Sequence, residues 1–466
     1  MSIVNKNEQK SRSVGFIALG CPKNVVDSEK MLALIAEAGF VIDMDSDNAD
    51  VVVINTCGFI KPAVDEATEV INQTLAKKRK GKIKKVVVAG CLPERMKEKL
   101  LEQFSKIDAV VCLGARDSIV NVIENLFSEN PAKFYQSPAD WVNKTQKDTD
   151  RLLINPSHWA YLRISEGCDR SCSFCTIPAI KGKFRSKPLD DIVAEANQLA
   201  DAGVAELSII AQDSANWGKD LGEKNGLVKI ISELEKIDKL KWIRPMYLNP
   251  SGITDELIEA IAKSGKVVHY IDMPIQHINN QILKAMHRPD TKEEISVLIE
   301  KIRNIIPDVV LRTTVIVGFP GETDRQFDEL LDFIKQIRFD ALGCFTFWPE
   351  EGTKAAQLSG RIPHNIKEDR QEKLMLTQQQ IAFEKNQSRK GQIIQCLIDE
   401  SRSDGSAIGR HYGQAPHIDS LCLIDNCSDP PGSFVKAVVA ALKTMIYCLK
   451  RFDFYFNILY STSYIL

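Results

Sequence analysis

The chain has 466 residues, of which 44% are hydrophobic and 26% charged, with a formal net charge of −2. These values are typical of soluble globular proteins, and the length predicts two or three domains. A net charge so close to zero excludes a general electrostatic attraction to nucleic acid or membranes. The N-terminus lacks the apolar core of a signal peptide, and nothing before residue 440 is apolar enough to span a bilayer. Twelve cysteines are too few for a disulfide scaffold in so long a chain, so we expect a cytoplasmic protein that keeps its thiols for metal.

The first quarter of the chain alternates short apolar strands with helical patterns. Strands are expected at 14–19, 51–54, 86–89 and 109–112, each followed by a helix. The first helix runs from about residue 24 to 38, and Gly39 ends it. This alternation predicts a doubly wound parallel sheet, which we place at residues 12–127.

Three cysteines of this domain stand at equivalent positions. Cys21, Cys57 and Cys91 each lie just past the end of a strand, at intervals of 36 and 34 residues. In an open parallel sheet, ligands bind at that edge. A single buried cysteine is usually a small hydrophobe, which is how we interpret Cys112. Three cysteines in matching glycine turns predict instead that they converge on one metal cluster.

A polar stretch with two prolines, residues 128–152, is expected to be a linker. A second alternating series follows, with strands expected at 161–164, 204–211, 241–247, 267–273, 309–317 and 341–347. Six such units predict a partial TIM-type (β/α)6 barrel over residues 153–367, with its active site at the C-terminal strand ends.

The loop after the first of these strands holds Cys168, Cys172 and Cys175 in a C-x3-C-x2-C array. Soft sulfur ligands select zinc, copper(I) or iron-sulfur centres. Structural zinc and ordinary ferredoxin sites close with four ligands, and no fourth cysteine or histidine lies within the next twenty residues. The array therefore favours a four-iron cubane with one open iron, and zinc is the alternative.

Two further strand ends carry polar or glycine-rich groups. Gln212 and Asp213 end the second barrel strand, and a Gly-Phe-Pro-Gly turn beginning at Gly318 follows the fifth. Glycines there let backbone amides approach a nucleoside, and the next helix points its N-terminus inward. Such a turn alone is equally typical of an ordinary loop. We expect these three residues to contact a cofactor.

The C-terminal region, residues 368–440, begins with an amphipathic segment and continues in short strands that predict a small β-barrel. Between residues 391 and 440 there are three Lys or Arg and six Asp or Glu, a net charge of −3 that repels phosphates. The last part, residues 441–466, contains seven Phe or Tyr. It is too interrupted for a membrane helix, so it either packs on a neighbouring surface or is exposed.

With Phe174 as its aromatic residue, C-x3-C-x-aromatic-C resembles the motif of radical S-adenosylmethionine (SAM) enzymes. The whole of residues 14–438 resembles the methylthiotransferases, in which a three-cysteine domain, a radical SAM barrel and a TRAM barrel follow in this order. The branch that modifies a ribosomal protein is the most similar, on the segments Leu19-Gly-Cys-Pro-Lys-Asn24, Asn55-Thr-Cys-Gly-Phe59, Ala89-Gly-Cys-Leu92, Gly318-Phe-Pro-Gly-Glu-Thr323, Pro349-Glu-Glu-Gly-Thr-Lys354 and Gly409-Arg-His-Tyr-Gly-Gln-Ala-Pro416.

The resemblance implies two 4Fe-4S clusters, the radical-generating one on Cys168, Cys172 and Cys175 and the auxiliary one on Cys21, Cys57 and Cys91. It implies that one SAM supplies a methyl group and a second yields a radical. The implied reaction is methylthiolation of the β-carbon of an aspartate in the twelfth protein of the small ribosomal subunit (S-twelve). The family does not share the tail at 441–466, which we interpret as divergent.

Two alternatives remain at this stage. A sister branch of the family modifies an adenosine in transfer RNA; the acidic C-terminal region favours a basic protein partner over RNA. From another class, a zinc-stabilised RNA-binding or scaffold protein would have no chemistry. The electron donor is not identified, and we expect no membrane partner.

Overall fold

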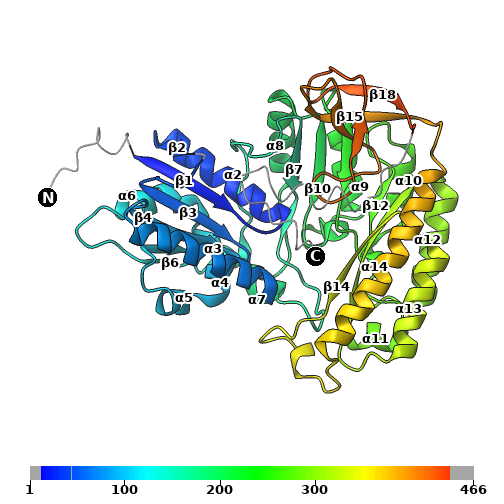
Figure 1. Cartoon of the computed structure of the whole chain (residues 1–466), viewed down its shortest axis with the longest axis horizontal. Helices are drawn as coiled ribbons and strands as arrows, with labels where there is room; N and C mark the ends of the chain where they lie inside the picture. Colours follow the sequence, from blue (N-terminus) through cyan, green and yellow to red (C-terminus); the bar gives the residue numbers. More distant parts are fainter. Residues whose placement is uncertain (1–11, 44, 441–466) are drawn as a thin grey trace.

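The computed structural model describes residues 12–43 and 45–440, so the tail predicted at 441–466 lies outside the described residues. Figure 1 shows the N-terminal domain in blue, a larger α/β domain beside it and a C-terminal sheet in orange above that domain.

A parallel sheet forms the centre of the N-terminal domain. Its strand order is β2-β1-β3-β4-β5-β6, and every pair is parallel. Apolar clusters on both faces pack it against helices, which confirms the doubly wound architecture. The strands are β1 (Ser13–Ala18), β2 (Val41–Asp43), β3 (Val51–Thr56), β4 (Lys85–Gly90), β5 (Ala109–Val111) and β6 (Phe134–Tyr135), and the helices are α2 (Pro22–Glu37), α3 (Lys61–Arg79), α4 (Cys91–Met96), α5 (Lys99–Gln103) and α6 (Ile119–Asn125).

Helix α2 joins this sheet to the neighbouring domain. Pro22 occupies its first turn, where a missing N–H costs nothing, and Gly39 follows its end with φ +87°. Ile35 packs in the sheet core, whereas Val25 and Val26 pack among barrel residues. The first turn of α2 thus lies against the barrel.

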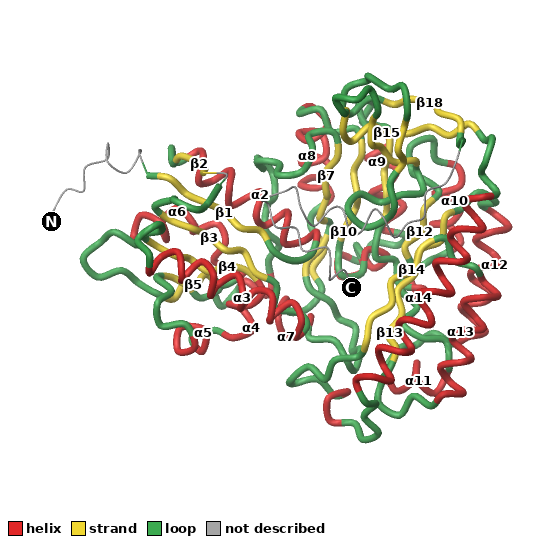
Figure 2. The backbone as a smooth tube through the Cα atoms, viewed as in Figure 1, coloured by secondary structure: helices red, strands yellow, loops and turns green. Residues whose placement is uncertain are grey.

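Six parallel strands build the second domain, as predicted. They form two three-stranded sheets, β11-β10-β7 and β12-β13-β14, and a bridge from Ile243 to Val267 joins them. Figure 2 shows the helices outside these strands. The strands are β7 (Trp159–Arg163), β10 (Glu206–Ile210), β11 (Trp242–Pro245), β12 (Tyr270–Asp272), β13 (Val310–Val317) and β14 (Ala341–Thr346), and the helices are α8 (Leu189–Asp201), α9 (Gly226–Glu235), α10 (Asp255–Lys263), α11 (Asn280–Ala285), α12 (Lys292–Ile305) and α13 (Asp324–Ile337).

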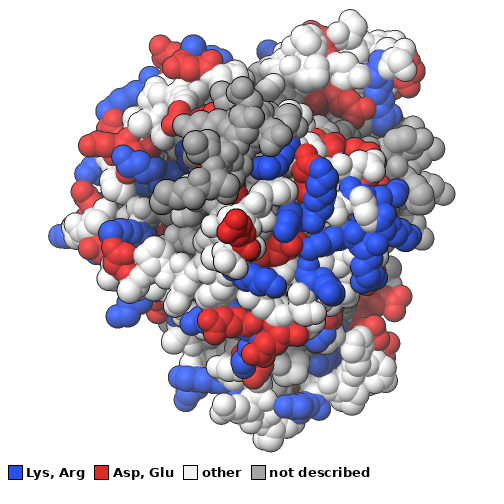
Figure 3. All heavy atoms as spheres, turned by 90° about the vertical axis from the view of Figure 1, so that its left-hand side faces the viewer, with Lys and Arg blue, Asp and Glu red and all other residues white. Residues whose placement is uncertain are grey.

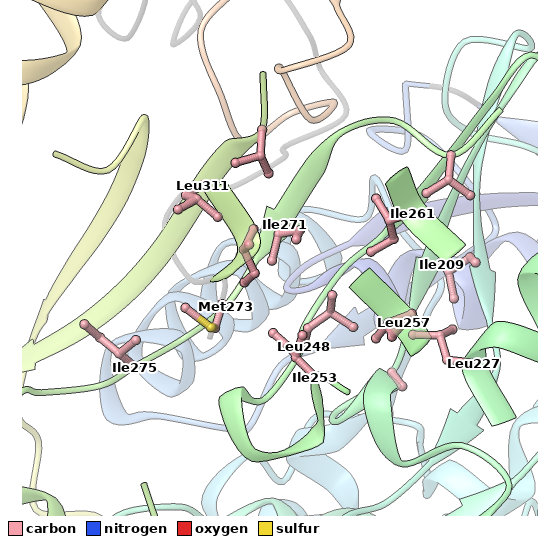
Figure 4. Packing of buried hydrophobic residues seen from close by; sticks show 14 of the residues in the cluster. Ile209, Leu227, Leu248, Ile253, Leu257, Ile261, Ile271, Met273, Ile275 and Leu311 are labelled. Atoms are coloured by element: carbon pink, nitrogen blue, oxygen red, sulfur yellow. The ribbon is translucent and has the colours of Figure 1, made fainter. Parts of the chain in front are cut away.

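Apolar side chains fill the layer between these strands and helices. Ile209, Ile271 and Leu311 from the strands meet Leu227 and Leu257 from the helices (Figure 4). Each is at most 3% exposed, and burying one such side chain contributes about 1.5–3 kcal/mol. This core fixes the strand ends that carry the site.

The loop after β7 is closed by a short hairpin. Its strands β8 (Ser165–Glu166) and β9 (Arg185–Ser186) pair antiparallel around the predicted cysteine array and the short helix α7 (Ile177–Lys181). The array therefore lies on a loop with a fixed base.

The C-terminal strands β15 (Ile393–Ser401), β16 (Ala407–His411), β17 (Cys422–Ile424) and β18 (Phe434–Val438) form a curled antiparallel sheet in the order β17-β16-β15-β18. The long helix α14 (His364–Gln387) precedes it. Leu374 and Ile381 of α14 lie in the barrel core, so this helix packs with the barrel although the predicted boundary at 367/368 places it with the C-terminal sheet. Likewise, β6 lies inside the predicted linker and pairs with β5.

The surface of the N-terminal domain carries both charge signs, with Lys and Arg gathered on one side (Figure 3). The basic run from Lys77 to Lys85 forms ion pairs with Asp47, Asp50 and Asp108. These ion pairs lie at a solvated face of the domain. Of the helices that the structure describes, none combines the length and apolarity needed to cross a membrane.

Candidate active site

Cys21, Cys57 and Cys91 follow the neighbouring strands β1, β3 and β4, so the sheet brings their loops together at one edge. The loops touch: a Cβ on Gly20 would lie 2.8 Å from Cys57 Cβ, and one on Gly58 would lie 2.9 Å from the carbonyl oxygen of Cys91. The glycine beside each cysteine is what allows this approach. The predicted convergence of the three loops is therefore present.

Asn24 fastens the three cysteine loops to one another. Its Nδ2 donates to the carbonyls of Leu19 at 2.8 Å and Thr56 at 3.0 Å, and its Oδ1 accepts from the Cys91 thiol at 3.7 Å. Asn55 adds a bond from its Nδ2 to the Asn24 carbonyl at 3.0 Å. The sequence did not predict a role for Asn24, although Asn24 is the last residue of the segment Leu19-Gly-Cys-Pro-Lys-Asn24 that carries the family resemblance.

Burial dominates the chemistry of these thiols. It raises the pKa of Cys57 to about 12, with the nearby Cys21 adding to the effect. Burial also raises the pKa of Cys91 well above its usual range, against the pull of the Lys181 ammonium. Such thiols stay protonated on their own, and metal binding is what displaces their protons. Their soft sulfur and their clustering fit an iron-sulfur centre.

The second set of cysteines, Cys168, Cys172 and Cys175, lies in the loop that strands β8 and β9 close. Cys168 N donates to the carbonyl of Gly182 at 3.2 Å. The sulfurs of Cys168 and Cys175 accept from the N–H groups of Arg170 and Ile177, each at 3.4 Å. Such donors stabilise thiolates, as a cluster requires.

The described residues contain no trio of Cys, His, Asp or Glu side chains around the position of a single ion. A cubane does not require one, because each of its three cysteines binds a different iron.

One hydrogen bond connects the two cysteine loops. Thr176, next to Cys175, donates from Oγ1 to the carbonyl of Phe59, two residues after Cys57, at 2.8 Å. Nearby, Glu350 accepts from Arg95 at 2.8 Å, which adds an ion pair between the domains. The loops that carry the two sets of cysteines therefore contact each other across the domain boundary.

A cavity of about 410 Å³ lies at this boundary, lined among others by Phe59, Phe174, Phe347, Trp348 and Glu350. Phe174, the aromatic residue of the cysteine motif, also packs against the apolar cluster around Phe319. The motif aromatic thus anchors the cysteine loop to the barrel.

At the barrel mouth, several buried polar atoms have no hydrogen-bond partner among the described residues. They include Gln212 Oε1, Asp213 Oδ1, Ser214 Oγ, Tyr247 Oη and Gln276 Oε1. Unpaired buried polar groups are costly, so their concentration at the strand ends fits a site that binds a polar cofactor. Asp213 also pairs with Arg170 of the cysteine loop at 2.5 Å, which places Gln212 and Asp213 beside that loop.

Gly318 has a different environment. Its N–H donates to Glu322 Oε2 at 2.6 Å, and Glu322 is held in turn by Arg370 at 2.9 Å. With φ +72° and Lys367 where a side chain would lie, only glycine fits. Here Gly318 closes the turn, and its contact with a cofactor stays a prediction.

A buried ion network lies behind the site and was missed in the sequence. Asp148 accepts from Arg116, Arg163 and Lys187 at 2.7 Å each, and Asp27 of α2 accepts from Arg163 at 2.8 Å. All these side chains are at most 3% exposed. The network joins α2, the linker and the barrel, so it fixes how the two cysteine loops contact each other.

Sequence comparisons agree with this architecture. The family models that match are the Radical SAM superfamily at residues 162–334, Uncharacterized protein family UPF0004 at 13–112 and the TRAM domain at 391–445. Among solved structures, the radical SAM methyltransferase TsrM from Kitasatospora setae, with cobalamin and a [4Fe-4S] cluster bound, aligns with a TM-score of 0.52 and 15% identity over 74% of this chain and 77% of that one. That likeness shows the fold.

The fold and the cysteine loop together define the chain as a radical SAM enzyme with two three-cysteine sets. A curated relative from Desulforamulus reducens, named ribosomal protein uS12 methylthiotransferase RimO, is 41% identical to this chain over 92% of this chain and 96% of the relative. A relative of the same name from Caldanaerobacter subterraneus is 44% identical over 92% of this chain and 97% of the relative. The chain belongs to the family of ribosomal protein uS12 methylthiotransferases.

Proposed function

We propose that this chain transfers a methylthio group to the β-carbon of an aspartate in ribosomal protein uS12, the protein called S-twelve above. The observation that carries the proposal is the contact between the two three-cysteine loops, through the hydrogen bond from Thr176 to Phe59. The relatives that share 41–44% identity over nearly their whole length bear the name of this activity.

In this proposal, Cys168, Cys172 and Cys175 hold one 4Fe-4S cluster and Cys21, Cys57 and Cys91 hold the other. When bound, the clusters and SAM supply the radical, the sulfur and the methyl group. Gln212 and Asp213 contact SAM at the barrel mouth, where both have unpaired buried oxygens. Gly318 shapes the adjoining turn and is the third proposed contact.

The residues of the chain position and shield the reactants. Arg170 pairs with Asp213 and thereby fixes the cysteine loop against the strand end that carries Gln212. The apolar residues around Phe174 and Phe319 cover the other side of that loop and exclude water. Exclusion of water prevents the loss of a reactive intermediate to side reactions.

The partner is the protein uS12, and we propose that the enzyme acts in the cytoplasm. The net charge of −3 on residues 391–440 favours a basic protein over RNA. Contact with RNA is therefore not favoured, and no membrane partner is proposed. The reductant that delivers the electron is an unidentified donor.

The test compares a strain that lacks this gene with the same strain complemented. Mass spectrometry of uS12 should show a methylthio group only in the complemented strain, while the modified adenosines of transfer RNA stay unchanged in both. Loss of a methylthio group from transfer RNA instead would transfer the assignment to the sister branch. Anaerobic reconstitution should give about eight irons per chain; a colourless zinc protein would contradict the enzyme assignment.

A further inference from the structure

Lys23 is a buried cation at the junction of the auxiliary cysteine loop and the barrel. It stands in the first turn of α2, two residues after Cys21, and is only 4% exposed. Its Nζ lies 3.2 Å from the ring centroid of Tyr247. Among the described residues, no ion pair involves Lys23. A buried ammonium held only by an aromatic face is incompletely compensated, so this position favours an incoming anion.

The nearby carboxylates are already engaged. Asp272 binds Arg312 at 2.7 Å through one oxygen and accepts a backbone N–H at 3.0 Å through the other. Glu166 forms an ion pair with Arg163, with 2.5 Å between Oε1 and Nη1. The two groups are not aligned as a hydrogen bond. Cys21 influences Lys23 more strongly than either acid does. Neither acid is free to pair with Lys23, so a ligand can supply the anion.

Tyr247 supplies a second donor at the same place. It follows β11 at the C-terminal end of the barrel, where substrates bind in this architecture. Its backbone is left-handed, with φ +60°, which is strained for a bulky residue and typical of functional sites. Its hydroxyl is buried and has no hydrogen-bond partner within the part of the chain that the structure describes. Burial raises the pKa of Tyr247 well above its usual range, so the hydroxyl stays a donor.

We propose that Lys23 and Tyr247 together bind the side-chain carboxylate of the substrate aspartate. The ammonium lies over the ring and the hydroxyl at its edge, so the two oxygens of one carboxylate can accept from both. The inference rests on the proposed function, because it names the group by which that substrate is recognised. Since the β-carbon is bonded directly to the carboxylate carbon, holding the carboxylate also fixes the reacting atom, and a neutral side chain is rejected.

The experiment measures binding and turnover with the reconstituted enzyme and two forms of uS12. One form carries the native target aspartate and the other carries asparagine there. The enzyme variants are Lys23→Met, Lys23→Arg and Tyr247→Phe. Lys30→Met is the control on the same helix, because Lys30 donates to the carbonyl of Thr149, away from the site.

We expect Lys23→Met to bind native uS12 about 10- to 100-fold more weakly, as for the loss of a hydrogen bond between charged groups. Lys23→Arg should recover part of this loss, and Tyr247→Phe should lose about fivefold. The asparagine form should bind the unsubstituted enzyme weakly, and Lys23→Met should weaken it no further. This non-additivity identifies the carboxylate as the partner of Lys23.

Three other results would overturn the inference. Unchanged binding of native uS12 by Lys23→Met would show that the Lys23 ammonium does not bind the substrate carboxylate. A weaker affinity for SAM would assign Lys23 to the carboxylate of the cofactor. A fall in iron content to about four per chain would assign it to the auxiliary cluster. If the unsubstituted enzyme does not modify uS12 at all, the proposed function fails first, and that outcome is separate from these three.

Discussion

Thr176 donates a 2.8 Å hydrogen bond to the carbonyl of Phe59 and so joins the loop of Cys175 to the loop of Cys57. The bond crosses the boundary between two domains that fold around separate cores. The bond lies one residue from Cys175 and two from Cys57, so it depends directly on how the two loops are aligned.

We expect Thr176→Val to keep both clusters but to reduce coupling between them. The substitution leaves the Phe59 carbonyl without its donor, at a cost of about 1 kcal/mol. Cleavage of SAM should continue at the normal rate, while methylthiolated product per cleaved SAM should fall about fivefold. Thr176→Ser retains the hydroxyl and is the matched control. Equal product ratios for Val and Ser variants would show that the bond does not align the sites.

Cys57→Ala should remove one of the two proposed clusters and so distinguish their roles. Cys57 belongs to the N-terminal set, so iron should fall from about eight to about four per chain. Cleavage of SAM should survive, whereas methylthiolation of uS12 should disappear. Cys112→Ala is the control, since Cys112 is equally buried but outside the set, and it should keep all its iron. Loss of SAM cleavage in Cys57→Ala would contradict the division of roles.

Gly20→Ala tests the close approach of the cysteine loops. An added Cβ would lie 2.8 Å from Cys57 Cβ, and the backbone has φ +97°, which disfavours any side chain. We expect the auxiliary iron to be lost and the melting temperature to fall. Gly203→Ala is the control: its φ is +103° but nothing lies within 4 Å of the added Cβ. Both variants are strained, so only Gly20→Ala should lose iron.

The sequence was sufficient to predict the strands and to place the cysteines beside them, because both are local signals. Runs such as residues 51–54 are apolar throughout, and Cys21, Cys57 and Cys91 follow strands that the parallel topology then aligns. The strand β2, at three residues, is too short for a periodic pattern, and β6 lies in a polar stretch.

Other features depend on contacts between distant segments. Nothing in the sequence around Lys23 indicates burial, because its environment is formed by Tyr247, more than two hundred residues later. The packing of α14 on the barrel is likewise tertiary. Its sequence is largely polar, and besides Leu374 and Ile381 in the barrel core the buried Gln378 donates to the carbonyl of Phe339. The hydrogen bond from the Gly318 N–H to the Glu322 side chain is also a contact that the sequence did not reveal, while the contact of Gly318 with a cofactor stays a prediction.

Asp148→Asn should destabilise the protein strongly at neutral pH. The carboxylate is fully buried and accepts from Arg116, Arg163 and Lys187. Removing its charge leaves these cations undercompensated, which costs about 3–5 kcal/mol when a buried ion pair is broken. The loss should appear as a lower midpoint in urea. Asp140→Asn is the control, because Asp140 pairs with Lys144 on the exposed surface and should leave the midpoint unchanged.

Asp148 should also determine how the stability of the protein changes at low pH. Burial by itself would raise the pKa of Asp148, but Arg163, Lys187 and Arg116 together hold that pKa well below its usual value of 3.8. A carboxyl whose folded pKa is depressed adds stability that is complete above the unfolded pKa and is lost as pH falls toward the folded one. The unsubstituted protein should therefore lose stability steeply below about pH 4. Asp148→Asn, which cannot titrate there, should show a shallower decline. Parallel curves for the two proteins would mean that Asp148 does not carry the acid sensitivity of the domain junction.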